Sequence, residues 1–158
     1  MDDEIASMKA FGVYGRVPKS VAQGRQILGC KWVYKRKTGK DGEVTRYRAR
    51  LVAQGFRQKE WDSFNPDEIS SPVAHKETLR LFLSTAAGLN LRVHQADVKA
   101  AFLQSNLSER IYLRAPQGYE SKTEKGEEKI ELQRAIYGLK QASASFWEAI
   151  SFHLKSIG

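Results

Sequence analysis

Apolar and polar residues alternate in two neighbouring segments of the first third of the chain, which predicts a β-hairpin. The segments KWVYKRK and VTRYRARLVA are rich in aromatic and branched residues and flank TGKDGE. The pair Asp41-Gly42 between them is typical of a two-residue hairpin turn. The register that this turn predicts places five pairs opposite each other: Lys40 and Glu43, Lys37 and Arg46, Lys35 and Arg48, Val33 and Arg50, Trp32 and Leu51.

The predicted register separates the hairpin side chains by type, because successive residues of a strand point to opposite faces. One face is basic and carries Lys31, Lys35, Lys37, Arg46, Arg48 and Arg50. The other carries Trp32, Tyr34, Tyr47, Ala49 and Leu51 and is expected to pack. Like charges placed opposite each other cost about 0.2–1 kcal/mol per pair. A bound polyanion would reverse that cost, whereas a merely solvated basic face is the alternative.

Further apolar patterns follow over residues 75–157. A 3.6-residue repeat predicts a helix over 75–88, with Leu79, Phe82, Leu83 and Ala86 in the core. Residues 91–98 are expected to form a central strand that Asp97 closes, followed by a short helix over 98–104. Strands are expected at 111–115 and 129–133. The closing segment predicts a helix that begins near Ser143 or Ser145, with an apolar stripe of Phe146, Ile150, Leu154 and Ile157.

The rest of the chain is expected to be less regular. Residues 1–11 could form a short helix, 12–29 are interrupted by glycine and proline, and 119–129 are polar enough for a surface loop. Strands and helices alternate without a strict repeat, so the sequence favours an α+β domain built on a mixed sheet with packed helices.

The positive charge of the chain is concentrated in the hairpin and the residues that follow it. The 158 residues carry a net charge of +8, and the stretch from Lys31 to Lys59 holds ten basic and two acidic residues. That stretch therefore accounts for the whole excess, and this concentration favours phosphate binding. A single cysteine, three scattered histidines and a mean hydropathy of −0.51 exclude a disulfide framework, a zinc ligand set and a membrane-spanning segment.

Asp97 is the most suggestive acidic residue, because it ends a predicted strand five positions before Phe102. A carboxylate in such a place can hold a divalent metal beside substrate phosphates. The alternative is that Asp97 caps a helix running from Val98 to Gln104. Phe102 in turn has the ordinary alternative of a core residue.

Five blocks, taken in order, resemble the copia-type reverse transcriptases of long-terminal-repeat retrotransposons. These blocks are GCKWVYKRK, DGEVTRYRARLVAQGF, FNPDEISSPVA, VHQADVKAAFLQSNLSERIYLRAPQGY and AIYGLKQASASFW. The resemblance implies a fragment with an N-terminal extension over 1–29, mainly fingers over 30–90, and the first part of the palm with the YGLKQA segment over 91–158.

The resemblance also implies roles for single residues. Asp97 would be a catalytic aspartate that holds Mg²⁺ together with the carbonyl of Val98. The nucleotide-binding residues would be Lys35, Lys37, Arg50, Phe102, Gly138, Lys140 and Gln141, with Phe102 as the steric gate against a 2′-hydroxyl. Arg46 and Arg48 would contact nucleic acid. The implied partners are a deoxynucleoside triphosphate and an RNA or DNA template-primer, with no membrane.

The 158 residues end before the aspartate pair that this family carries further along its chain. We therefore expect the chain by itself to be inactive as a polymerase. A noncatalytic module that binds nucleic acid is the alternative. Self-association through an exposed edge of the palm is a further expectation, because the strand at 91–98 would lack a neighbour.

Overall fold

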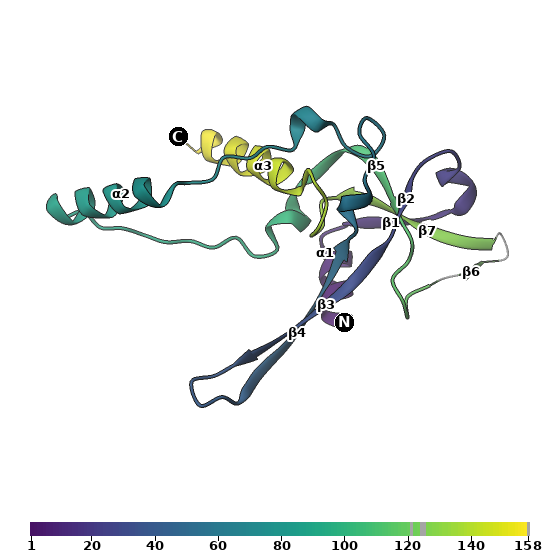
Figure 1. Ribbon diagram of the computed structural model, residues 1–158, viewed down its shortest axis with the longest axis horizontal. Coiled ribbons are helices and arrows are strands. Elements are labelled where there is room, and N and C mark those ends of the chain that lie inside the picture. Colours follow the sequence, from purple (N-terminus) through teal and green to yellow (C-terminus); the bar gives the residue numbers. More distant parts are fainter. Residues whose placement is uncertain (121, 124–125, 158) are drawn as a thin grey trace.

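The computed structural model of the protein describes residues 1–120, 122–123 and 126–157, and its centre is a mixed sheet (Figure 1). The strands follow the order β1-β7-β5-β2, and β6 pairs with β7. All pairs are antiparallel except the parallel pair of β2 and β5. The expected α+β class with a mixed, largely antiparallel sheet is therefore confirmed. The strand bounds are β1 (Tyr14–Pro18), β2 (Ile27–Leu28), β5 (Asn106–Leu113), β6 (Lys122–Thr123) and β7 (Gly126–Arg134).

Two predictions of irregular structure were wrong, because strand pairing decides these elements. The stretch 12–29, predicted to be irregular, supplies β1 and β2, whose partners lie more than 80 residues away along the chain. The predicted loop over 119–129 includes β6 and the start of β7. Residues 121, 124 and 125 of that prediction lie outside the described residues. Short polar strands carry little pattern of their own and depend on their neighbours.

The core lies between the sheet and the first helix, α1 (Asp2–Ala10), which confirms the helix expected over 1–11. Ile5 and Met8 of α1 are buried against sheet residues. The sheet side of this core includes Val13, Leu28, Ile111, Leu113, Ile130 and Leu132. These six side chains come from four separate segments of the chain, so the core depends on the whole sheet being assembled.

The β-hairpin forms a separate two-stranded sheet of β3 (Cys30–Thr38) and β4 (Val44–Ala53). Four of the five predicted pairs are confirmed, namely Lys37 with Arg46, Lys35 with Arg48, Val33 with Arg50, and Trp32 with Leu51.

The predicted hairpin turn was wrong. Gly39 donates its N–H to the carbonyl of Glu43 at 2.8 Å, and Gly42 donates to the carbonyl of Gly39 at 3.2 Å. Lys40 and Asp41 are therefore the central turn residues, and Lys40 does not face Glu43. Gly42 follows with a positive φ of 79°. This longer loop shifts the register beyond Lys37 and is a common alternative to a two-residue turn.

Only the base of the hairpin packs on its apolar face. Leu51 is buried and Trp32 is half-buried, but Tyr34 and Tyr47 remain 66% and 75% exposed. The expectation that Tyr34 and Tyr47 would pack was wrong, because the hairpin projects away from the main sheet (Figure 1).

The second helix, α2 (Lys76–Gly88), forms as predicted but does not enter the core. Leu79, Phe82 and Leu83 are about half exposed, and Ala86 is the buried member of the predicted stripe. Figure 1 shows α2 lying apart from the sheet at the end of two long connections. The core prediction for this stripe was wrong because no described element covers it.

The strand predicted over 91–98 does not form, and these residues are exposed and have no regular secondary structure. Among the described residues no strand pairs with this segment, so its backbone has no ladder to join. A 3₁₀-helix, η4 (Ala101–Gln104), replaces the longer helix predicted over 98–104.

The closing helix, α3 (Ala142–Ser156), is confirmed, although its N-cap is Gln141 rather than Ser143 or Ser145. Phe146 and Ile150 are partly buried, whereas Leu154 and Ile157 at the far end stay exposed. No helix in the described parts of the chain has the length and apolar character needed to cross a membrane.

Candidate nucleotide-binding site

A cavity of about 680 Å³ lies where the β3–β4 hairpin meets α1 and the chain leading into η4. Six of the residues singled out in the sequence line it together: Arg46, Arg48, Arg50, Asp97, Val98 and Phe102. They come from two segments that are nearly fifty residues apart. The fold therefore brings the basic hairpin and the candidate aspartate to one cavity.

Arg50 is the basic residue placed deepest in this arrangement. Its pairing with Val33 sets its position near the base of the hairpin. The guanidinium carbon lies 4.5 Å from the centre of the Tyr137 ring, which is cation–π distance. Its Nε atom is buried and has no hydrogen-bond partner within the described part of the chain. A partly desolvated cation with an unused donor is well suited to bind an anion.

Phe102 and Tyr137 form an aromatic corner beside Arg50. The two rings meet edge to face, with 5.1 Å between their centres, and the centre of the Phe146 ring lies 6.4 Å from that of Phe102. Tyr137 thus contacts both Arg50 and Phe102. Sequence reasoning missed Tyr137, and the available signal was its position directly before Gly138 in the YGLKQA segment.

Asp97 and Val98 are exposed on the wall of the cavity. The alternative that Asp97 caps a helix was wrong: the N-cap of η4 is Ala100, in a left-handed conformation, and no side chain caps this helix. Within the described residues no group of three or more His, Cys, Asp or Glu side chains could hold a metal ion. Asp97 with the Val98 carbonyl is therefore not a complete metal site by itself.

The acidic start of α1 forms another wall that the sequence did not reveal. Asp3 and Glu4 line the same cavity as the three arginines. Burial raises the pKa of Glu4, although a backbone hydrogen bond from Leu51 and the positive charges of Arg48 and Arg50 act in the opposite direction. The fixed acidic groups around the cavity therefore partly balance its cations.

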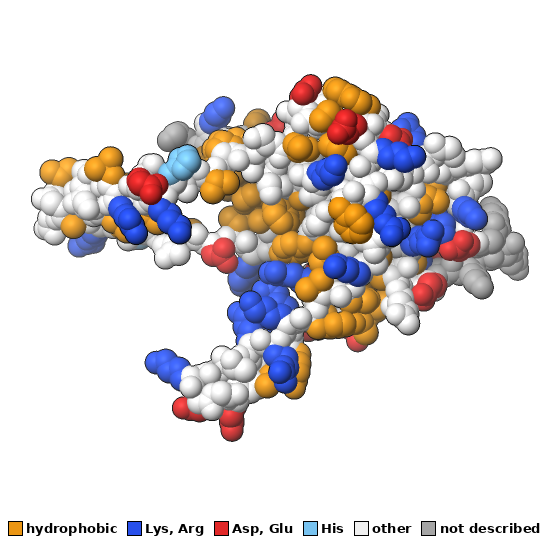
Figure 2. Space-filling view, in the orientation of Figure 1, with side chains coloured by type: hydrophobic (Ala, Val, Ile, Leu, Met, Phe, Trp, Pro, Cys, Tyr) orange, Lys and Arg blue, Asp and Glu red, His pale blue; other side chains and the backbone are white. Residues whose placement is uncertain are grey.

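Two predicted lysines lie outside this cavity. Lys35 and Lys37 stand opposite Arg48 and Arg46 on the exposed outer part of the hairpin. Figure 2 shows Lys and Arg side chains gathered along this hairpin. The four cations form a solvated basic strip that leads toward the cavity, since Arg46 and Arg48 belong to both.

The YGLKQA segment lines the cavity through Tyr137, whereas its predicted site residues Gly138, Lys140 and Gln141 do not line it. Lys140 places its Nζ atom 4.1 Å from the ring centre of Phe64, and Gln141 is buried among protein groups. Gly138 has a φ of 89°, and a Cβ there would come within 2.3 Å of the Ala53 carbonyl oxygen. Gly138 therefore permits close packing against β4, to which Ala53 adds a 2.8 Å hydrogen bond from its N–H to the Tyr137 carbonyl.

Comparisons with known proteins identify the family of the chain. The family model described as reverse transcriptase (RNA-dependent DNA polymerase) matches residues 13–158. The family is generally metal-dependent and acts on a nucleic-acid template. No solved structure gives a significant match.

Several curated relatives are Pol polyproteins of transposons. The retrovirus-related Pol polyprotein from transposon TNT 1-94 of Nicotiana tabacum is 41% identical over 99% of this chain and 11% of its own length. That from transposon RE2 of Arabidopsis thaliana is 35% identical over 84% of this chain and 9% of its own. The transposon Ty1-ER2 Gag-Pol polyprotein of Saccharomyces cerevisiae is 28% identical over 96% and 8%. The chain thus spans about a tenth of these relatives, and it belongs to the reverse transcriptase family as a copia-type domain of a retrotransposon polyprotein.

Proposed function

We propose that the cavity between the hairpin and Asp97 binds the triphosphate of an incoming deoxynucleotide in RNA-directed DNA synthesis. The observation that carries this proposal is that Arg50 and Asp97, far apart in the sequence, line one cavity together with Phe102. Arg50 has an unused buried donor for a phosphate oxygen. Phe102, which lines the same cavity beside Tyr137, would present its aromatic ring to the sugar of the nucleotide.

The chemistry that suits this site is phosphoryl transfer. A primer hydroxyl attacks the α-phosphate in line, and pyrophosphate leaves as the bond to the β-phosphate breaks. Arg50 and its neighbours Arg46 and Arg48 would stabilise the negative charge that grows on the leaving group. Mg²⁺ would arrive as the ion carried by the triphosphate, because Asp97 and the Val98 carbonyl alone do not complete its ligand shell.

The division into subdomains follows from the same proposal. Residues 30–90 would be mainly fingers and 91–158 the first part of the palm, with 1–29 as an extension whose strands join the main sheet. In this arrangement Lys35 and Lys37 lie outside the cavity. They would contact the triphosphate or the template only while that ligand approaches along the outer hairpin. Lys140 and Gln141 contact protein groups, so they would support the site without contacting the nucleotide.

A direct test is calorimetric titration of the 158-residue chain with dGTP in the presence of magnesium. We expect Arg50→Ala to weaken binding about tenfold or more, since a charge-assisted hydrogen bond to phosphate is lost. Arg110→Ala removes an exposed arginine from β5, outside the cavity, and serves as the matched control. Equal binding by the wild type and Arg50→Ala would contradict the proposal.

The second candidate function is noncatalytic binding of nucleic acid, which the paired cations of the outer hairpin favour. For this function, binding to a primer-template duplex would fall steeply with salt and would be lost in a variant with Arg46, Arg48 and Arg50 changed to alanine.

In a primer-extension assay we expect the 158-residue chain alone to add no nucleotide. Incorporation that Asp97→Ala abolishes would contradict that expectation.

A further inference from the structure

Gln58 is a buried glutamine whose side-chain amide is fully used by the protein. It is 6% exposed and lies just after η2 (Gly55–Arg57), which follows β4. Its Oε1 accepts a 2.8 Å hydrogen bond from the backbone N–H of Lys140. Its Nε2 donates to the Ser63 carbonyl at 2.8 Å and to Oε1 of Gln141 at 2.9 Å. Three bonds to three backbone or side-chain partners fix the orientation of this amide.

Gln141 completes the arrangement from the other side. It is 3% exposed, and its Nε2 donates to the Ser63 carbonyl at 3.0 Å and to Glu109 Oε2 at 3.2 Å. The two glutamines therefore join the loop after β4, the YGLKQA segment and β5. Buried amides are retained at low cost only when they are satisfied in this way, and removing one partner leaves the others unpaired.

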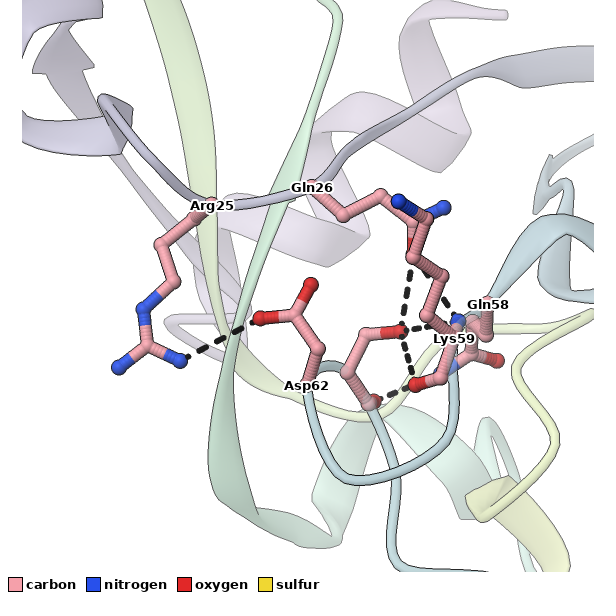
Figure 3. Close-up of polar contacts among 6 residues, drawn as sticks. Arg25, Gln26, Gln58, Lys59 and Asp62 are labelled. Carbon is pink, nitrogen blue, oxygen red and sulfur yellow. Dashed lines mark hydrogen bonds and ion pairs between the residues drawn. The ribbon is translucent and has the colours of Figure 1, made fainter.

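The loop that carries Gln58 is anchored independently, as Figure 3 shows. Gln26 Oε1 accepts hydrogen bonds from the Lys59 N–H at 3.1 Å and from Ser63 Oγ at 3.0 Å. Arg25 pairs with Asp62 at 3.5 Å. Gln58 thus extends from a fixed support toward the Lys140 backbone, so it can hold that backbone in place.

The backbone that Gln58 holds leads directly to the nucleotide cavity. Three residues before Lys140 in the chain, Tyr137 bonds β4 through its carbonyl and places its ring against both Arg50 and Phe102. Gly55 and Gly138 approach so closely that a Cβ on Gly55 would lie 1.9 Å from the Gly138 carbonyl oxygen. Such close packing leaves little room for the segment to move without moving Tyr137.

We propose that Gln58, paired with Gln141, is a positioning residue for nucleotide selection: it holds the Tyr137–Lys140 backbone so that Tyr137 sets the Phe102 ring against the sugar and the Arg50 guanidinium against the triphosphate. This inference rests on the proposed function. It also gives Gln141 a role behind the site, in place of the direct nucleotide contact that the resemblance implied.

The test compares binding of dGTP and GTP by calorimetry, because the ratio of the two affinities reports the placement of Phe102. Gln58→Met keeps the side-chain length and removes all three hydrogen bonds. We expect it to lower the preference for dGTP about threefold to tenfold, and to speed hydrogen exchange at the Lys140 amide. Gln133→Met makes the same change at an exposed glutamine of β7 and should alter neither measurement.

If circular dichroism shows that Gln58→Met is unfolded, a second and milder variant, Gln141→Met, is used for the same measurement. Gln141→Met removes the pair but leaves Gln58 bonded to Lys140 and Ser63, so a smaller fall in the same ratio is expected. If the wild type prefers dGTP and a folded variant at either position keeps the full preference, the inference fails while the proposed function stands. If the wild type binds neither nucleotide, both fail.

Discussion

The helices α1 and α2 differ in how their apolar residues are buried: the weaker apolar pattern is buried and the stronger one is exposed. In α1 the apolar face amounts to little more than Ile5 and Met8, and both are buried. In α2 a longer and more regular apolar stripe stays largely exposed. The difference shows that burial depends on a surface to pack against. The sheet and hairpin offer that surface to α1, whereas no described element offers one to α2.

The largest expected difference between these regions is in hydrogen exchange. Isolated helices as short as α2 are marginal in water, whereas the strands of the sheet should open only when the whole domain unfolds. We expect amides of β5 and β7 to exchange roughly a thousandfold more slowly than those of α2. Similar protection in the two regions, measured by mass spectrometry, would show that α2 is packed in solution.

Truncating one apolar side chain in each helix compares how much the two helices contribute to the free energy of unfolding. Met8 is 1% exposed, so Met8→Ala should lower the free energy of unfolding by about 2–5 kcal/mol. Leu83 is 47% exposed, and Leu83→Ala should stay within about 0.5 kcal/mol of the wild type. Urea denaturation measures both. A large loss in Leu83→Ala would mean that the α2 stripe has a partner.

The exposed stripe of α2 should also promote self-association of the chain. The edge expected from a strand at 91–98 does not exist, so the apolar surface of α2 takes its place as the contact. Sedimentation at rising concentration should show association that Phe82→Glu suppresses. Ser84→Glu adds the same charge on the opposite side of the helix and should leave association intact. A monomer at every concentration would exclude this contact.

The smallest effect concerns Glu4, at the junction of α1 and the hairpin. Because burial raises the pKa of Glu4 above 4.5, its favourable contribution is present below pH 4.5 and is lost as pH rises through the folded-state pKa. Glu4→Gln should therefore gain stability relative to the wild type between pH 4 and pH 7. Unfolding experiments at both pH values test this sign, and an unchanged difference would refute it.

Much of the hairpin and of the candidate site could be predicted from residue order. Local alternation was enough for the register from Lys37 with Arg46 to Trp32 with Leu51, because period-two side-chain placement needs no distant information. The turn itself was missed, since a glycine after aspartate suits more than one loop length. Tyr137 was missed because its place before Gly138 in the YGLKQA segment does not show that its ring contacts Arg50 and Phe102.

The sequence by itself determined the helices α1, α2 and α3, the charge-segregated hairpin and the family, since these depend on short periodicities and on ordered motifs. Only the tertiary structure decided which apolar stripe is buried, which segment forms a strand, and that Arg50 and Asp97 line one cavity while Gln141 lies behind it. The physical reason is that burial and strand pairing are properties of two surfaces, and a pattern along the chain describes only one of them.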